Sequence, residues 1–141
     1  MGKFYIAARG NEQGIARARV VRDALVAAGH TWTMDWTIDM ERNFAKGIRD
    51  TNLSFDGKKT YAALDHDAVK TAEVFIYLEP DEKSEGAAAE FAYADAYDVQ
   101  TIAVCAGVPR CLFVAWADHI VKTDAEAIDL ACTLLERNLT P

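Results

Sequence analysis

The chain has 141 residues, 51% of them hydrophobic, which suits one compact domain with a real core rather than two domains. Its formal net charge of −7 disfavours binding to nucleic acid or to anionic membranes and favours a small-molecule ligand. We expect neither a membrane span nor a signal peptide, since no suitable apolar stretch is present. The cysteines lack CxxC spacing, which is typical of a reduced, cytoplasmic chain.

Strand-like and helix-like segments alternate along the chain, as in parallel sheets that are covered on both faces. The expected strands are residues 3–8, 30–36, 73–78, 101–106 and 111–115. The expected helices are 13–28, a short one near 40–48, 61–71, 84–98 and 124–138, with a polar loop up to residue 59. This order predicts a single α/β domain over 1–141, with a doubly wound, flavodoxin- or Rossmann-like parallel sheet of five strands and helices on both faces.

The segment Ser84 to Ala96, SEGAAAEFAYADA, places Glu90 inside an apolar, alanine-rich helix that follows a buried strand. A carboxylate in such a helix is costly unless it has a function or pairs with a buried arginine. Ser84 is a suitable helix cap, and Gly86 allows close approach of the backbone to a ligand. Because open α/β sheets bind ligands at the carboxyl ends of their strands, Glu90 is a candidate site residue.

The loop Arg9 to Gly14, RGNEQG, offers glycines, backbone amides and an arginine at the start of a helix, which favours an anion. It has neither the P-loop ending nor the GxGxxG spacing of a dinucleotide site, and an ordinary polar connection is the alternative. We expect no cofactor and no metal, because the acids and histidine of Asp65-His66-Asp67 point in different directions on a helix. Trp36, at the end of the second strand, is either a core residue or a contact to a nucleobase.

These features resemble the nucleoside 2-deoxyribosyltransferase superfamily, and their motifs are closest to the 2′-deoxynucleoside 5′-monophosphate N-hydrolases. The resemblance rests on Phe4-Tyr5-Ile6-Ala7-Ala8, on the run from Ser84 to Ala94 that contains Glu90, and on the final helix opened by Thr123. It implies that Glu90 is the nucleophile and that Glu73, at the start of the third strand, is the acid that protonates the leaving base. Asp35 and Asp67 are weaker candidates for that acid.

The resemblance also implies a phosphate site, because monophosphate hydrolases use Ser at the position of Ser84, where transferases for free nucleosides use Asp. Ser84, Arg9 and the Gly10 backbone would hold the phosphate, and Tyr5 would orient Glu90. The remaining substrate contacts expected are Ala7, Gly86, Asp35 and Trp36. A nucleophilic Glu must be ionised, and we expect Arg9, Tyr5 and the helix N-terminus to keep it so near neutral pH.

The sequence therefore predicts hydrolysis of the N-glycosidic bond of a (deoxy)nucleoside 5′-monophosphate, which releases the base and a sugar 5-phosphate. Base exchange by a nucleoside 2-deoxyribosyltransferase is the first alternative. A TIR-like NAD glycohydrolase and a nucleotide-sensing protein without catalysis are two further readings. By resemblance alone, a homodimer or larger homo-oligomer is expected.

Overall fold

The computed structural model describes residues 2–138 and contains one sheet whose five strands are all parallel. The strands are β1 (Lys3–Ala7), β2 (Thr31–Trp32), β3 (Val74–Leu78), β4 (Gln100–Val104) and β5 (His119–Val121). Their order is β2-β1-β3-β4-β5, so the direction of winding reverses between β1 and β3. The predicted fold class is confirmed, and the reversal marks the point where such sheets bind ligands.

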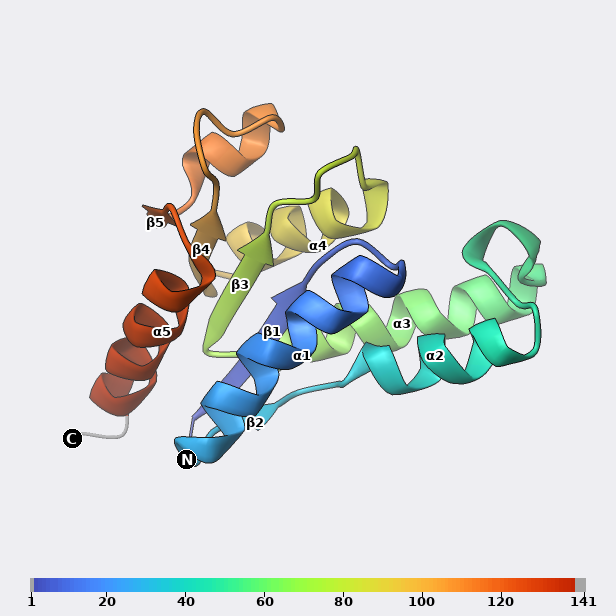
Figure 1. The fold of residues 1–141 in the computed structure, drawn as a ribbon, viewed down its shortest axis with the longest axis horizontal. Coiled ribbons are helices and arrows are strands. Elements are labelled where there is room, and N and C mark those ends of the chain that lie inside the picture. Colours follow the sequence, from blue (N-terminus) through green and yellow to red (C-terminus); the bar gives the residue numbers. More distant parts are fainter. Residues whose placement is uncertain (1, 139–141) are drawn as a thin grey trace.

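Helices cover both faces of this sheet (Figure 1). The helices are α1 (Glu12–Ala27), α2 (Trp36–Ala45), α3 (Phe55–Thr71), α4 (Glu85–Ala96) and α5 (Asp124–Asn138), with short 3-10 segments η1 (Asp50–Asn52) and η2 (Leu112–Trp116). Figure 1 shows α1 and α5 on one face and α3 and α4 on the other, with α2 alongside α3 beyond the β2 edge. Among residues 2–138, no helix is long and apolar enough to cross a membrane.

The two central strands are buried on both faces, which explains their continuous apolar and aromatic sequences. Tyr5 of β1 lies opposite Phe75 of β3 in the parallel register, and their rings stack at 5.8 Å. Phe91 of α4 packs edge-on against Phe75 at 6.2 Å, which fixes the helix on this part of the sheet. The core therefore lies directly beneath the carboxyl end of β1 and β3.

The second strand and the helix that follows it differ from the prediction. Only Thr31 and Trp32 form a ladder with β1, and Trp36 already begins α2. The cause is Asp35, whose carboxylate accepts the Thr37 N–H at 3.0 Å and caps the helix. The predicted loop up to residue 59 is also too long, since α3 begins at Phe55.

The fifth strand was predicted in the wrong place. Residues 111–115 are apolar, but they form η2 on the surface, where the side chain of Leu112 is 81% exposed. The ladder with β4 is made instead by His119–Val121. Asp118, just before it, accepts hydrogen bonds from the backbone N–H and the hydroxyl of Thr101 at 2.9 and 3.2 Å, which sets the start of the pairing.

Candidate active site

A cavity of about 130 Å³ lies at the carboxyl ends of β1 and β3, and we call it the Glu90 cavity. It is lined by residues from the β1–α1 loop, α2, η1, α3 and the first turns of α4. They are Tyr5, Ala8, Gly10, Trp36, Met40, Asp50, Asp65, Ser84, Gly86, Ala87 and Glu90. The structure thus brings together six predicted site residues, namely Tyr5, Gly10, Trp36, Ser84, Gly86 and Glu90.

Tyr5 and Glu90 form the polar centre of this cavity. The Tyr5 hydroxyl donates a hydrogen bond to Glu90 Oε2 across 85 positions of sequence. The phenol is fully buried between Phe75, which stacks on it, and Trp32, whose ring meets it edge-on at 6.5 Å. Because the ring is held by packing on both sides, its hydroxyl is preorganised toward the carboxyl group.

Burial raises the pKa of Glu90 to about 8. The negative charge of Asp65 raises this pKa further, whereas the hydrogen bond from Tyr5 lowers it. The same burial, together with the nearby Glu90 and Asp65 charges, raises the pKa of Tyr5 well above its ordinary value. The expectation that Glu90 is held ionised at neutral pH is wrong for the unliganded protein, because desolvation outweighs the hydrogen bond.

Arg9 does not supply the expected positive charge to Glu90. Its guanidinium pairs with Glu82 of the β3–α4 loop at 2.7 Å, and it does not line the Glu90 cavity. Gly10, the next residue, does line it. In the predicted phosphate-binding loop, Gly10 therefore faces the Glu90 cavity, whereas the Arg9 guanidinium is directed away from the Glu90 carboxylate.

Asp65 of α3 is the second carboxyl group of the site, and sequence reasoning missed it in this role. Burial raises its pKa to about 6, with further contributions from the charges of Asp50 and Asp39. The signal was available: Asp65 precedes the buried pair Ala68 and Val69 by three and four positions, so it shares their helix face. Like Glu90, it is an acid on the inward side of a helix.

Glu73 does not join this group, and its predicted place beside the leaving base is wrong. It precedes β3, where its N–H donates to Lys3 O at 2.9 Å, and it lines a different pocket together with Asp98 and His119. A strand of five residues is about 17 Å long, so the start of β3 lies far from its carboxyl end. Glu73 therefore lies at the amino ends of the strands, whereas Glu90 lies at their carboxyl ends.

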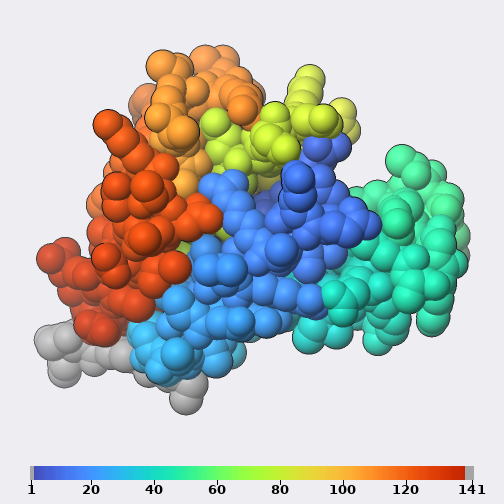
Figure 2. Space-filling view, viewed as in Figure 1, coloured from blue at the N-terminus to red at the C-terminus, as the bar shows by residue number. Residues whose placement is uncertain are grey.

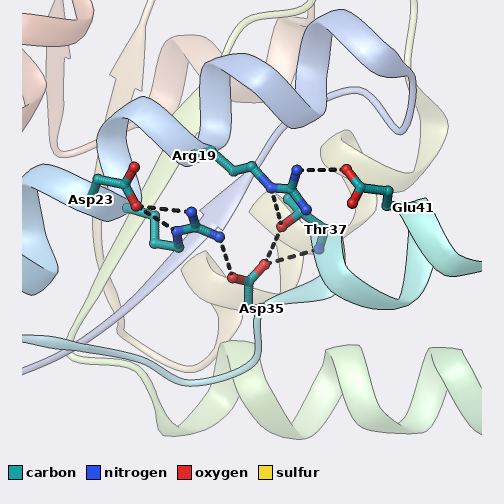
Figure 3. Close-up of polar contacts among 6 residues, drawn as sticks. Arg19, Asp23, Asp35, Thr37 and Glu41 are labelled. Atoms are coloured by element: carbon teal, nitrogen blue, oxygen red, sulfur yellow. Dashed lines mark hydrogen bonds and ion pairs between the residues drawn. The ribbon is translucent and has the colours of Figure 1, made fainter.

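Asp35 does not line the Glu90 cavity, and its carboxylate belongs instead to a network of hydrogen bonds and ion pairs (Figure 3). Its carboxylate pairs with Arg22 of α1 at 2.9 Å and accepts from both the N–H and the hydroxyl of Thr37. Arg19 donates to the same hydroxyl at 3.2 Å and pairs with Glu41 at 2.6 Å. These contacts join α1 to the start of α2, which fixes the helix that carries the cavity residue Trp36.

Trp36 lines the cavity and is at the same time a core residue. Its indole N–H donates to Ile6 O at 2.8 Å, and the side chain is 9% exposed. Ala7, expected to contact the substrate, is fully buried within β1, and Ala8 lines the cavity in its place. The chain therefore meets the cavity at Ala8, one residue after the end of β1 and one residue later than predicted.

Ser84 closes the cavity at the start of α4. Its hydroxyl accepts the Ala87 N–H at 3.4 Å, which confirms the predicted cap. A Cβ placed on Gly86 would have no atom within 4 Å, so the backbone there is open to a ligand. The first turn of α4 thus presents a hydroxyl, the accessible backbone at Gly86 and the positive end of the helix dipole.

Two larger cavities share polar residues with this centre. One, of about 390 Å³, lies between α2 and α3, has Phe44 and Tyr61 in its lining, and shares Trp36, Asp50 and Asp65 with the Glu90 cavity. The other, of about 500 Å³, shares Ser84 and contains Lys83 and Arg110. Among residues 2–138, no cluster of three His, Cys, Asp or Glu side chains is suited to a metal ion.

Comparisons with known proteins agree with this architecture. The structure is similar to that of the CMP N-glycosidase BcmB of Clostridium botulinum, with 18% identity, a TM-score of 0.59 and coverage of 92% of this chain and 96% of the other. It is also similar to the 2-deoxyribosyltransferase of Bacillus psychrosaccharolyticus, with 14% identity, a TM-score of 0.66 and 90% of each chain covered. No family model and no curated protein matches the sequence. The fold is that of these two enzymes, as the resemblance in sequence implied.

Proposed function

We propose that the protein hydrolyses the N-glycosidic bond of a nucleoside 5′-monophosphate, with Glu90 as the nucleophile. The observation that carries this proposal is the Tyr5–Glu90 pair in a cavity at the point where the sheet reverses its winding. The two structural neighbours, a CMP N-glycosidase and a 2-deoxyribosyltransferase, support chemistry at this type of bond. With free cysteines only, a cytoplasmic enzyme is the corresponding proposal.

The cavities suggest how the three parts of a nucleotide would be placed. The sugar occupies the Glu90 cavity, and the base occupies the larger space between α2 and α3, where Trp36 and Tyr61 are available for stacking. The phosphate lies at Ser84 and the Gly86 amide, on the side where the neighbouring cavity contributes Lys83. A serine hydroxyl at this place avoids the repulsion that a carboxylate would exert on a dianion.

The two partly buried carboxyl groups would divide the chemistry between them. The Glu90 carboxylate attacks C1′ as the C1′–N bond breaks, and the base leaves with a proton donated by Asp65. Water then hydrolyses the glycosyl-enzyme bond, with Asp65 accepting its proton, so both groups return to their starting states. Between about pH 6 and 8, Glu90 and Asp65 together hold one proton. In the reactive state this proton is on Asp65, and Glu90 is ionised.

Base exchange is the second candidate, because the fold is shared with a 2-deoxyribosyltransferase. It uses the same glycosyl-enzyme intermediate, which a second base resolves in place of water. A free nucleoside would then react at least as well as its monophosphate, and added base would increase product formation. These two measurements separate the transferase from the hydrolase.

We also propose assembly into a homodimer through the surface around η2. Val108, Leu112, Phe113 and Trp116 are between 68% and 91% exposed there, which is an unusual density of large apolar side chains on a surface. Light scattering after size-exclusion chromatography should give twice the chain mass, and Trp116→Glu should give the monomer. A monomeric wild-type protein would contradict the proposal.

The test is a panel of nucleosides, their 5′-monophosphates and NAD, with free base measured by chromatography. Monophosphates should release base, and Glu90→Gln should reduce kcat by at least about a hundredfold, as expected for a covalent nucleophile. Glu85→Gln is the matched control, because it makes the same change at an exposed position of the same helix. Equal activity of the two variants would refute the assignment, and ligand binding without any base release would favour a sensing protein.

A further inference from the structure

We propose that a second cavity, at the start of α1, binds the phosphate group of a small phosphorylated molecule. This α1 cavity has a volume of about 340 Å³ and lies at the carboxyl ends of β1, β3 and β4. Ala8 is the one residue whose lining it shares with the Glu90 cavity. Figure 2 shows the hollow between the blue start of α1, the yellow-green β3–α4 loop and the orange segments before α5.

The loop RGNEQG, which favours an anion, is turned mainly toward this cavity. Arg9, Asn11, Gln13 and Gly14 line it, whereas Gly10 faces the Glu90 cavity. The loop folds tightly onto the helix, because a Cβ on Gly14 would lie 1.7 Å from Arg9 O. The anion-binding part of the loop thus remains unused by the proposed nucleotide site.

The charge of the lining is opposite to that of the whole protein. Arg9, Arg17, Arg110 and Lys122 enter the cavity from four different segments, against the two acids Glu79 and Asp81. The chain itself carries a net charge of −7. A cationic concavity in an acidic protein concentrates small anions at that place.

The four cations differ in how far they are already engaged, and Arg9 pairs with Glu82 at 2.7 Å. Arg17 is a fixed wall, since it binds Asp124 with two bonds of 2.9 and 2.8 Å and the Glu79 carbonyl at 2.7 Å. The Arg110 guanidinium donates to Pro80 O, which places it at the rim. Within residues 2–138, the Lys122 ammonium has no carboxylate within ion-pair distance, so its charge remains available to a ligand.

These features select a phosphate in preference to a larger or uncharged ligand. Asn11 Oδ1 already accepts the Gly14 N–H at 2.8 Å, so the positive end of the 16-residue helix would act on a compact dianion from beyond this cap, together with the Lys122 ammonium and a guanidinium. The volume lies at the lower end of the range for small-ligand sites, which admits a sugar phosphate but not a dinucleotide. The site is independent of the proposed hydrolysis, because its lining contains neither Glu90 nor Asp65.

The test uses ¹⁵N-labelled protein titrated with inorganic phosphate and with ribose 5-phosphate, while amide shifts are followed at both helix starts. Both probes should shift the amides of residues 12–14. Lys122→Gln should weaken this effect by roughly tenfold, the loss expected for one charge-assisted contact. Lys83→Gln is the matched control, since Lys83 lines the cavity beside Ser84 and not the α1 cavity.

Three results would overturn the proposal. They are phosphate shifts confined to residues 84–87, unchanged binding at residues 12–14 in Lys122→Gln, and equal binding of succinate, which carries two carboxylates but no phosphate. Base release from nucleotides is measured separately on the same variants. Since Lys122→Gln leaves the Glu90 cavity intact, a protein without glycosidase activity could still pass this test, and an active one could fail it.

Discussion

Removal of one hydroxyl group, in Tyr5→Phe, should move the pH dependence of catalysis upward. The Tyr5 hydrogen bond lowers the pKa of Glu90, which burial has raised to about 8. A hydrogen bond to a charged group contributes about 1.5–3 kcal/mol, and about 1.4 kcal/mol corresponds to one pH unit. Without the bond, the pKa of Glu90 should therefore rise to about 9–10.

The assay is kcat/KM for base release between pH 6 and pH 10, which reports on the free enzyme. At pH 7 the ionised fraction of Glu90 falls by roughly ten- to a hundredfold in Tyr5→Phe, and kcat/KM should fall with it. Tyr77→Phe is the control, because Tyr77 lies on β3, makes no hydrogen bond to Glu90, and has a pKa raised to about 12. An unchanged midpoint of the kcat/KM profile in Tyr5→Phe would show that the Tyr5 hydroxyl does not stabilise the Glu90 carboxylate.

Four further variants test the electrostatics of the site and the backbone at two helix starts. Asp65→Asn removes the proposed proton donor, so kcat should fall; it also removes a charge that raises the pKa of Glu90, so the midpoint of the remaining kcat/KM profile should move below about 8, and an upward move would contradict this. The folded-state pKa of Glu90, about 8, exceeds its ordinary value of 4.5, so its contribution to stability is fully present below about pH 4.5 and is lost as the pH rises through 8. Glu90→Gln should not show this loss, so its free energy of unfolding in urea should exceed that of the wild type by a few kcal/mol at pH 9. Equal free energies of unfolding at pH 9 would refute the raised pKa of Glu90. Gly14→Ala should cost at least about 2 kcal/mol in thermal unfolding, because its Cβ meets Arg9 O, whereas Gly86→Ala, with open space, should gain about 0.5–1 kcal/mol; similar effects would contradict the geometry.

The parts of the site that lie within one helix could be predicted from the sequence. Ser84 caps α4 and Glu90 lies six positions later, so the apolar pattern and the capping residue were sufficient to predict that both lie at one end of the sheet, where they line the same cavity. Asp65 belongs to α3, and its interaction with Glu90 depends on how two helices pack against the same strand. Asp65 was not predicted to lie on the inward face of its helix, and the pattern alone could not show which cavity its side chain meets.

The error on Glu73 could have been avoided by the argument that located Glu90. In a parallel sheet all strands begin at the same end, and the ligand site lies at the opposite, carboxyl end of the strands. Glu73 comes directly before β3 and therefore lies at the amino ends of the strands, away from the ligand site. For Arg9 the difficulty is different, since its pairing with Glu82 joins two loops whose relative positions only the tertiary structure defines.

The 85 positions between Tyr5 and Glu90 also have a consequence for how the protein folds. β1 has only a two-residue ladder with β2, so most of its pairing is with β3, far along the chain. Closing so long a loop is entropically expensive and slow, and no shorter segment can bring the two side chains together. The hydroxyl–carboxyl contact therefore cannot form on a chain still emerging from the ribosome until α4 has been synthesised, so the Glu90 cavity is incomplete up to that point.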